Sequence, residues 1–66
     1  MSQNKFIRYE LLGDALIWCD DKGNVVYRRS RSGFWYINES PYSFDTWLEL
    51  VDLPDEEKVW LRLHFG

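Results

Sequence analysis

The fold is decided by the stretch DDKGNVVYRRSRSGFWY, residues 20–36, which contains two turns of the same kind. Asp20-Asp21-Lys22-Gly23 and Ser30-Arg31-Ser32-Gly33 each open with a short side chain that can bond its own backbone. Each closes with a glycine, which adopts positive φ without steric cost. This is the chemistry of a type I turn followed by a G1 bulge, a common hairpin loop. Two such loops predict three consecutive antiparallel strands.

Outward from these loops, β-forming residues fill three strands at 15–20, 24–29 and 34–39. A further strand is expected at 6–12, although its two leucines suit a helix equally well. Leu12-Gly13-Asp14-Ala15 predicts a two-residue hairpin turn with glycine first, which joins this strand to the next. The result is an antiparallel meander of three to four strands.

The loop types also predict which residues pair across the strands. The first loop places Trp18 opposite Val26, and the second places Tyr27 opposite Ile37. The two-residue turn at the start of the meander places Tyr9 opposite Trp18. An error of one residue in any loop would exchange the faces of a strand.

Side chains alternate along a strand, so this register sorts the residues onto two faces. One face is almost wholly apolar and is predicted to form the core; it carries Ile7, Tyr9, Leu11, Leu16, Trp18, Val26, Arg28, Phe34 and Tyr36. The other mixes charges with an apolar row and is predicted to be exposed; it carries Phe6, Arg8, Glu10, Leu12, Ile17, Cys19, Tyr27, Arg29, Trp35, Ile37 and Glu39.

The last third of the chain carries helical signals. Ser40-Pro41-Tyr42-Ser43 breaks the sheet pattern, and Ser43 is a good N-cap. An apolar stripe with helical spacing follows, consisting of Phe44, Trp47, Leu48 and Val51. Pro54 ends this helix and can open a second one, with Asp55, Glu56 and Glu57 in its first turn and Arg62 and His64 in its last.

Residues 59–65 also alternate as a strand would, so two architectures stay open. The acidic opening of the segment favours a helix. We therefore expect a single α+β domain over residues 1–66, in which one or two C-terminal helices pack on one face of the meander. If the tail is a strand, the fold becomes a five-stranded, barrel-like sheet with one helix.

The sequence offers no clustered chemistry for catalysis. Cys19 and His64 form the only thiol–imidazole combination, and both have simpler structural explanations. Asp20, Asp21 and Asn24 lack the spacing of a calcium loop and fit a turn. We therefore expect no catalytic residue, no metal, no cofactor and no enzymatic activity.

Charge, hydrophobicity and cysteine content limit the kinds of partner and the cellular compartment that we expect. The net charge of −3 disfavours general nucleic-acid affinity. No stretch approaches the ~18 apolar residues that would indicate a membrane span. Residues 1–5 lack the apolar region of a secretory signal, and there is a single cysteine. These features predict a chain that works in a reducing cytoplasm.

The predicted exposed face has the composition of an interface. Aromatic, aliphatic and arginine side chains lie together there: Ile17, Tyr27, Arg29, Arg31, Trp35 and Ile37. They predict a small non-catalytic module that docks on a protein partner or self-associates, with a homodimer through Ile17, Tyr27 and Ile37 as one form. The alternative is single-stranded nucleic-acid binding through Arg28, Arg29, Arg31, Trp35 and Tyr27.

Residues 20–36 also resemble a known kind of repeat. Asp20-Asp21-Lys22-Gly23-Asn24-Val25-Val26-Tyr27 followed by Ser32-Gly33-Phe34-Trp35-Tyr36 is similar to the hairpin repeats of bacterial and phage proteins and to the YD repeats of Rhs-type proteins. The resemblance covers about a quarter of the chain and a single unit. It implies a β-hairpin and a bacterial or mobile-element origin, and it transfers no catalytic residue. The small size, the absence of clustered chemistry, the mild acidity and the predicted exposed face lead us to expect a bacterial or phage accessory or inhibitor protein.

Overall fold

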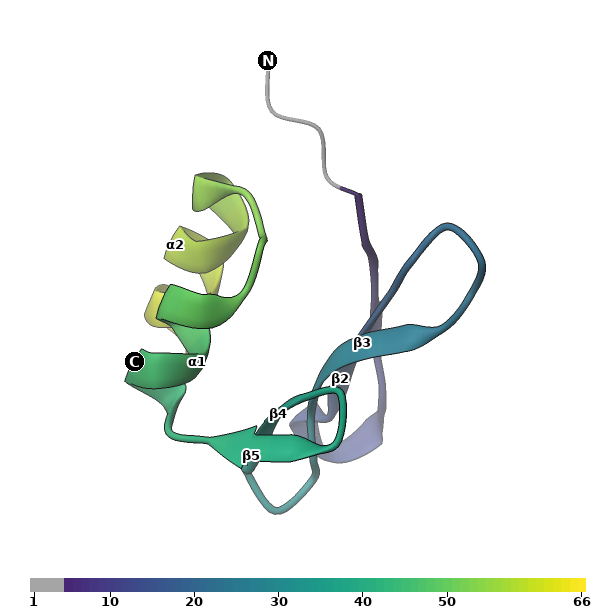
Figure 1. Ribbon diagram of the computed structural model, residues 1–66. Helices are drawn as coiled ribbons and strands as arrows, with labels where there is room; N and C mark the ends of the chain where they lie inside the picture. The colour runs from purple at the N-terminus through teal and green to yellow at the C-terminus, as the bar shows by residue number, and fades with distance from the viewer. Residues whose placement is uncertain (1–4) are drawn as a thin grey trace.

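The computed structural model describes residues 5–66 and has an α+β fold, in which a five-stranded antiparallel meander is followed by two helices (Figure 1). Its elements are β1 (Ile7–Glu10), a 3-10 turn η1 (Leu12–Asp14), β2 (Leu16–Cys19), β3 (Val25–Arg29), β4 (Trp35–Ile37), β5 (Ser40–Tyr42), α1 (Phe44–Leu50) and α2 (Asp55–Phe65). The strands lie side by side in chain order. Residues 1–4, where a secretory signal was not expected, lie outside the described residues.

Both glycine-closed loops form as predicted. Gly23 and Gly33 have φ of +86° and +95°. In the first loop, the backbone N–H of Asp20 donates to the Asn24 carbonyl (2.9 Å), and in the second the N–H of Ser30 donates to the Phe34 carbonyl (2.9 Å). The predicted register between β3 and β4 is therefore confirmed.

The register between β2 and β3 differs from the prediction because β3 contains a bulge. Trp18 pairs with Tyr27 and Cys19 with Val25, so Val26 is an extra residue opposite the bond between Trp18 and Cys19. The Val26 carbonyl instead accepts a hydrogen bond from the Asn38 N–H (2.7 Å). Beyond the bulge the faces of β3 are exchanged, and Tyr27 shares the face of Trp18.

The register of β1 also differs by one residue, because the loop after it is one residue longer than predicted. The turn η1 occupies three residues, with Gly13 and Asp14 both at positive φ (+73° and +62°), and the Leu11 N–H donates to the Ala15 carbonyl (2.8 Å). Tyr9 therefore lies opposite Ile17 and not opposite Trp18. A shift of one residue moves every side chain of a strand to the other face.

The predicted break at residues 40–43 proves wrong in its first part. Ser40–Tyr42 forms β5, which pairs with β4 at the edge of the sheet. Pro41 is tolerated there because an edge strand can do without one backbone donor. Asn38, at φ +55°, helps to turn the chain between the two strands.

The two helices begin and end where the sequence indicates. Ser43 caps α1, its hydroxyl accepting from the Thr46 N–H at 3.4 Å. Pro54 precedes α2, which runs to Phe65 and so excludes the strand alternative for the tail. Both helices lie on the same side of the sheet (Figure 1), as predicted for a pair packed on one face.

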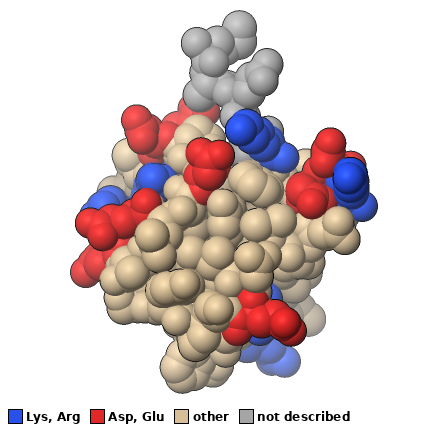
Figure 2. Space-filling model, viewed as in Figure 1, with Lys and Arg blue, Asp and Glu red and all other residues tan. Residues whose placement is uncertain are grey.

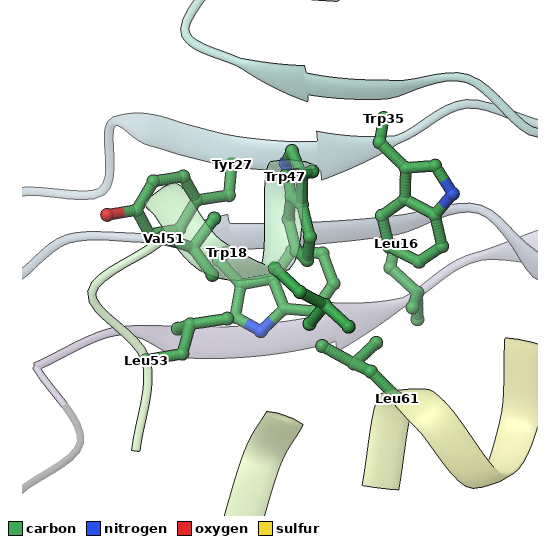
Figure 3. Close-up of a cluster of buried hydrophobic side chains, with 9 residues drawn as sticks. Leu16, Trp18, Tyr27, Trp35, Trp47, Val51, Leu53 and Leu61 are labelled. Carbon is green, nitrogen blue, oxygen red and sulfur yellow. The ribbon is translucent and has the colours of Figure 1, made fainter. Parts of the chain in front are cut away.

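The core lies between the helices and one face of the sheet, with Trp47 of α1 at its centre. Its ring lies 4.6 Å from that of Trp35, 5.3 Å from Trp18 and 6.0 Å from Tyr27, measured between centroids. Figure 3 shows these rings pointing toward one another from strands and helix. The remaining buried residues of the cluster are Leu16, Leu48, Val51, Leu53 and Leu61.

Polar groups of the core rings are bonded at its margins. The Trp47 Nε1 donates to the Tyr36 carbonyl (2.8 Å), and the Tyr27 hydroxyl accepts from the Asp52 N–H (3.0 Å). The Trp18 Nε1 donates to the Glu57 carboxylate at 3.1 Å. Each bond ties a strand to the helical layer, so the aromatic core specifies how the two layers meet.

Candidate interaction surface

The structure separates the residues that were predicted to form one exposed patch. Tyr27 and Trp35 are core residues, only 7% and 5% exposed, because the bulge turns them toward the helices. Ile37 packs against the same core, whereas Ile17 is half-buried on the opposite face. The face assignment was therefore wrong for β3 and β4, and also for β1, whose Ile7 and Tyr9 were predicted to face the core and are exposed. The row that was to support a homodimer is not one surface.

The two predicted arginines also separate. Arg29 points to the core side, where its Nη1 donates to the Asp14 carbonyl (2.7 Å). Its guanidinium lies over the Phe65 ring at 4.3 Å and near the Trp35 ring at 5.4 Å. Arg31 lies exposed in the second hairpin loop. Arg29 thus fastens η1 and α2 to the sheet, which is a structural role.

Another surface takes the place of the predicted patch. The pairings align Tyr9, Ile17, Arg28, Tyr36 and Pro41 in one row across all five strands, on the face away from the helices. No element among residues 5–66 covers this row. Tyr9, Arg28 and Tyr36 of this row were predicted to face the core, whereas Ile17 was predicted to be exposed.

Apolar side chains surround the row. We call outer face the set formed by Ile7, Tyr9, Leu11, Ile17, Arg28, Phe34 and Tyr36. Ile7 and Phe34 are 57% and 58% exposed, and Tyr9 and Leu11 about half. Ala15 and Cys19 lie on the same side and are buried, yet neither belongs to the core cluster. The largest contiguous apolar patch on a monomer is often a functional one.

Arg28 is the charged member of the outer face. Its guanidinium carbon lies 3.8 Å from the centroid of the Tyr36 ring, on the neighbouring strand. This cation–π contact holds the side chain flat against the sheet. No carboxylate within residues 5–66 forms an ion pair with it.

Charge is distributed unevenly between the two layers. Residues 43–66, which contain both helices, carry six acidic and two basic side chains, a net charge of −4. Residues 5–42, which contain the sheet, carry five acidic and six basic side chains, a net charge of +1. In the view of Figure 2 the charged side chains stand mostly toward the rim and leave an uncharged area between them.

A second cluster joins β1 to α2. The Arg8 Nη1 donates to the Glu57 carboxylate at 2.7 Å, and the Arg8 guanidinium lies 3.8 Å from the centroid of the Trp60 ring. The same carboxylate oxygen accepts from Trp18. His64 stacks on Trp60, with 4.2 Å between ring centroids. Because Arg8 and Trp18 both donate to Glu57, this cluster connects the sheet to α2 at the edge of the core.

The groups considered for chemistry do not come together. Cys19 is buried toward the outer face, whereas His64 stacks on Trp60 in α2, on the other side of the sheet. The Asp20 side chain stabilises the first hairpin loop, because its Oδ1 accepts from the N–H groups of Lys22 and Asn24, both at 2.9 Å. These bonds, that of Asn24 above all, hold the pKa of the Asp20 carboxyl below its ordinary value.

Within residues 5–66, no group of three or more histidine, cysteine and acidic side chains is arranged to hold a metal ion. The helices of this part of the chain are all too short or too polar to span a bilayer. The outer face is therefore the feature that calls for a functional explanation.

In comparisons with known proteins, no family model, no curated protein and no solved structure matches the chain.

Proposed function

We propose that the chain is a small non-catalytic protein-interaction module that docks on a larger partner through its outer face. One observation carries the proposal: a five-stranded sheet leaves an apolar face uncovered, with an arginine held over a tyrosine at its centre. Tyrosine and arginine are enriched among the residues that contribute most to protein–protein binding.

The proposal includes the cellular compartment and the origin of the module. Cys19 is unpaired and buried, which suits a reducing cytoplasm. The hairpin resemblance of residues 20–36 suggests a bacterial or mobile-element origin, and the small size of the chain suits a bacterial or phage accessory or inhibitor protein. Such a protein would act by occupying a surface of its target, which needs no reactive group of its own.

Site-specific photo-crosslinking in the producing cell tests the proposal. A photoreactive phenylalanine analogue replaces Phe34 on the outer face, and in a control it replaces Leu63 on α2, which is 82% exposed. We expect a discrete covalent adduct with another protein from position 34 and none from position 63. Equal adducts from both positions, or none from position 34, would overturn the proposal.

Single-stranded nucleic-acid binding is a second candidate, because exposed rings beside an arginine can stack bases. Tyr9, Phe34 and Tyr36 supply the rings, and Arg28 supplies the cation. A fluorescence titration with a labelled oligothymidylate at rising salt distinguishes the two functions. Nucleic-acid binding predicts saturable binding that weakens as salt rises, since phosphate contacts release counterions.

A further inference from the structure

We infer that the outer face binds a short apolar segment of a larger protein that carries a carboxylate, and that Arg28 anchors this carboxylate. The inference rests on the proposed function and adds the chemistry of the partner.

Arg28 differs from the other two arginines of the sheet because, among residues 5–66, no oxygen atom forms a hydrogen bond or ion pair with its side chain. Arg8 donates to the Glu57 carboxylate, and Arg29 donates to the Asp14 carbonyl. Arg28 instead lies over Tyr36. Stacking on a ring leaves the N–H groups in the plane of the guanidinium available. A half-buried cation held in this way is already ordered for a bidentate bond to a carboxylate.

The rest of the outer face is apolar, so it selects for apolar neighbours of that carboxylate. Ile7 and Tyr9 of β1 and Leu11 directly after it lie on the outer side, and Phe34 lies across the sheet. An acidic side chain flanked by aliphatic or aromatic ones matches this pattern of one cation among apolar contacts.

A second copy of this chain is a poor occupant. Arg28 belongs to the middle strand of five, so a face-to-face dimer whose two-fold axis passes through the centre of the sheet would bring the two Arg28 side chains against each other. The face is also small: five strands ~4.8 Å apart and a few residues long give a footprint on the order of 300–400 Å². A standard interface takes about 800 Å² from each partner. A short segment fits this area better than a second globular surface.

Nucleic acid is also disfavoured as the occupant. The outer face contains one basic side chain, and the chain as a whole has a net charge of −3. Affinity for a nucleic-acid backbone comes from several phosphate contacts made together. A single carboxylate needs only one guanidinium.

The experiment uses a displayed library of random twelve-residue peptides as the probe and the full chain as the target. Selected peptides are synthesised with their acidic residue intact and with it changed to the amide. Fluorescence anisotropy then measures their affinity for the wild type, Arg28→Gln, Arg28→Lys and Tyr9→Ser. Arg31→Gln is the matched control, because it removes the same charge from an exposed loop. Circular dichroism verifies that each variant is folded.

The expected peptides carry Asp or Glu among apolar residues, and Arg28→Gln weakens their binding about 10-fold or more. Arg28→Lys gives a smaller loss, and Arg31→Gln changes the affinity less than about 2-fold. The amide peptide loses as much as Arg28→Gln does, and combining the two changes adds little, as for two groups that bond each other.

Two results overturn the inference, and they bear differently on the proposed function. If the selected peptides lack acidic residues and respond to Tyr9→Ser but not to Arg28→Gln, the face binds protein without a carboxylate anchor, and the proposed function stands. If no peptide responds to any outer-face variant, and the chain forms a dimer in sedimentation or binds an oligothymidylate instead, both the inference and the proposed function fail.

Discussion

The two faces of the sheet carry the same kinds of side chain, and only one of them is covered. Arg28 and Arg29 are neighbours in β3, and each lies over an aromatic ring. The ring under Arg29 is Phe65 of α2, which packs against the core. The ring under Arg28 is Tyr36, which is half-buried on the side of the sheet away from the helices. The role of a residue in this sheet therefore depends on the face on which it lies, and not on its residue type alone.

The largest difference in stability between the two faces is expected when one ring is removed from each of them. Trp47→Ala empties the centre of the core and should lower the free energy of unfolding by about 3–5 kcal/mol. Phe34→Ala, on the outer face, should change it by less than about 0.5 kcal/mol. Urea denaturation followed by far-ultraviolet circular dichroism measures both. Equal losses would mean that the outer face is as much a core as the inner one.

A smaller effect is expected at the margin between sheet and helices. Glu57→Leu leaves the Trp18 indole without its acceptor and Arg8 with only its longer contact to Glu10 (3.4 Å), and it should cost about 1–3 kcal/mol of unfolding free energy. Glu57→Gln keeps an acceptor oxygen and should cost less. Glu49→Gln, at an exposed position of α1, is the control. If Glu57→Leu and Glu49→Gln have equal midpoints in urea, the bonded cluster does not hold the layers together.

The two hairpin loops allow a finer test of what sets the register. Gly23→Ala and Gly33→Ala place a side chain at φ +86° and +95°, which should cost about 1–2 kcal/mol each. Neither new methyl group meets a closer neighbour than an ordinary contact, so backbone strain is the whole cause. Gly23→Asn should cost less, since asparagine tolerates positive φ. Unequal costs in thermal unfolding would show that the loops are not equivalent.

The smallest effect concerns pH and the first loop. The pKa of Asp20 is lowered by the backbone N–H of Asn24 and that of Lys22, so its charged form is favoured in the folded chain. The stabilisation is therefore present above the ordinary pKa of 3.8 and is lost as the pH falls through the lowered folded-state value. An NMR titration of the Asp20 side chain measures this, and an Asp20→Ala variant should show a weaker acid dependence of stability.

Local chemistry accounts for the parts of the fold that could be predicted. The glycine-closed loops, the β3–β4 register, the Ser43 cap and the end of α1 near Pro54 each depend on residues close together in the chain. The helical tail was favoured by its acidic first turn and its basic last turn, which match the helix dipole.

The outer face could not be predicted because two registers shifted by one residue. Leu12-Gly13-Asp14 forms a three-residue turn where a two-residue turn fits the sequence equally well, and Val26 enters a bulge that no local residue demands. The aspartate at position 14 was a signal for the longer turn, since aspartate tolerates positive φ better than most residues, and Asp14 has φ +62°. Each shift moves a whole strand to the other face.

The sequence alone determined that the chain forms an antiparallel meander followed by helices, and that its loops close on Gly23 and Gly33, because turns and caps depend on interactions within a few residues. Only the tertiary structure decided which face the helices cover. Tyr27 and Trp35 pack around Trp47 of α1 on the covered face, and Arg28 with Tyr36 is left outside. Packing between distant segments makes that choice, since both faces are rich enough in apolar side chains to form a core.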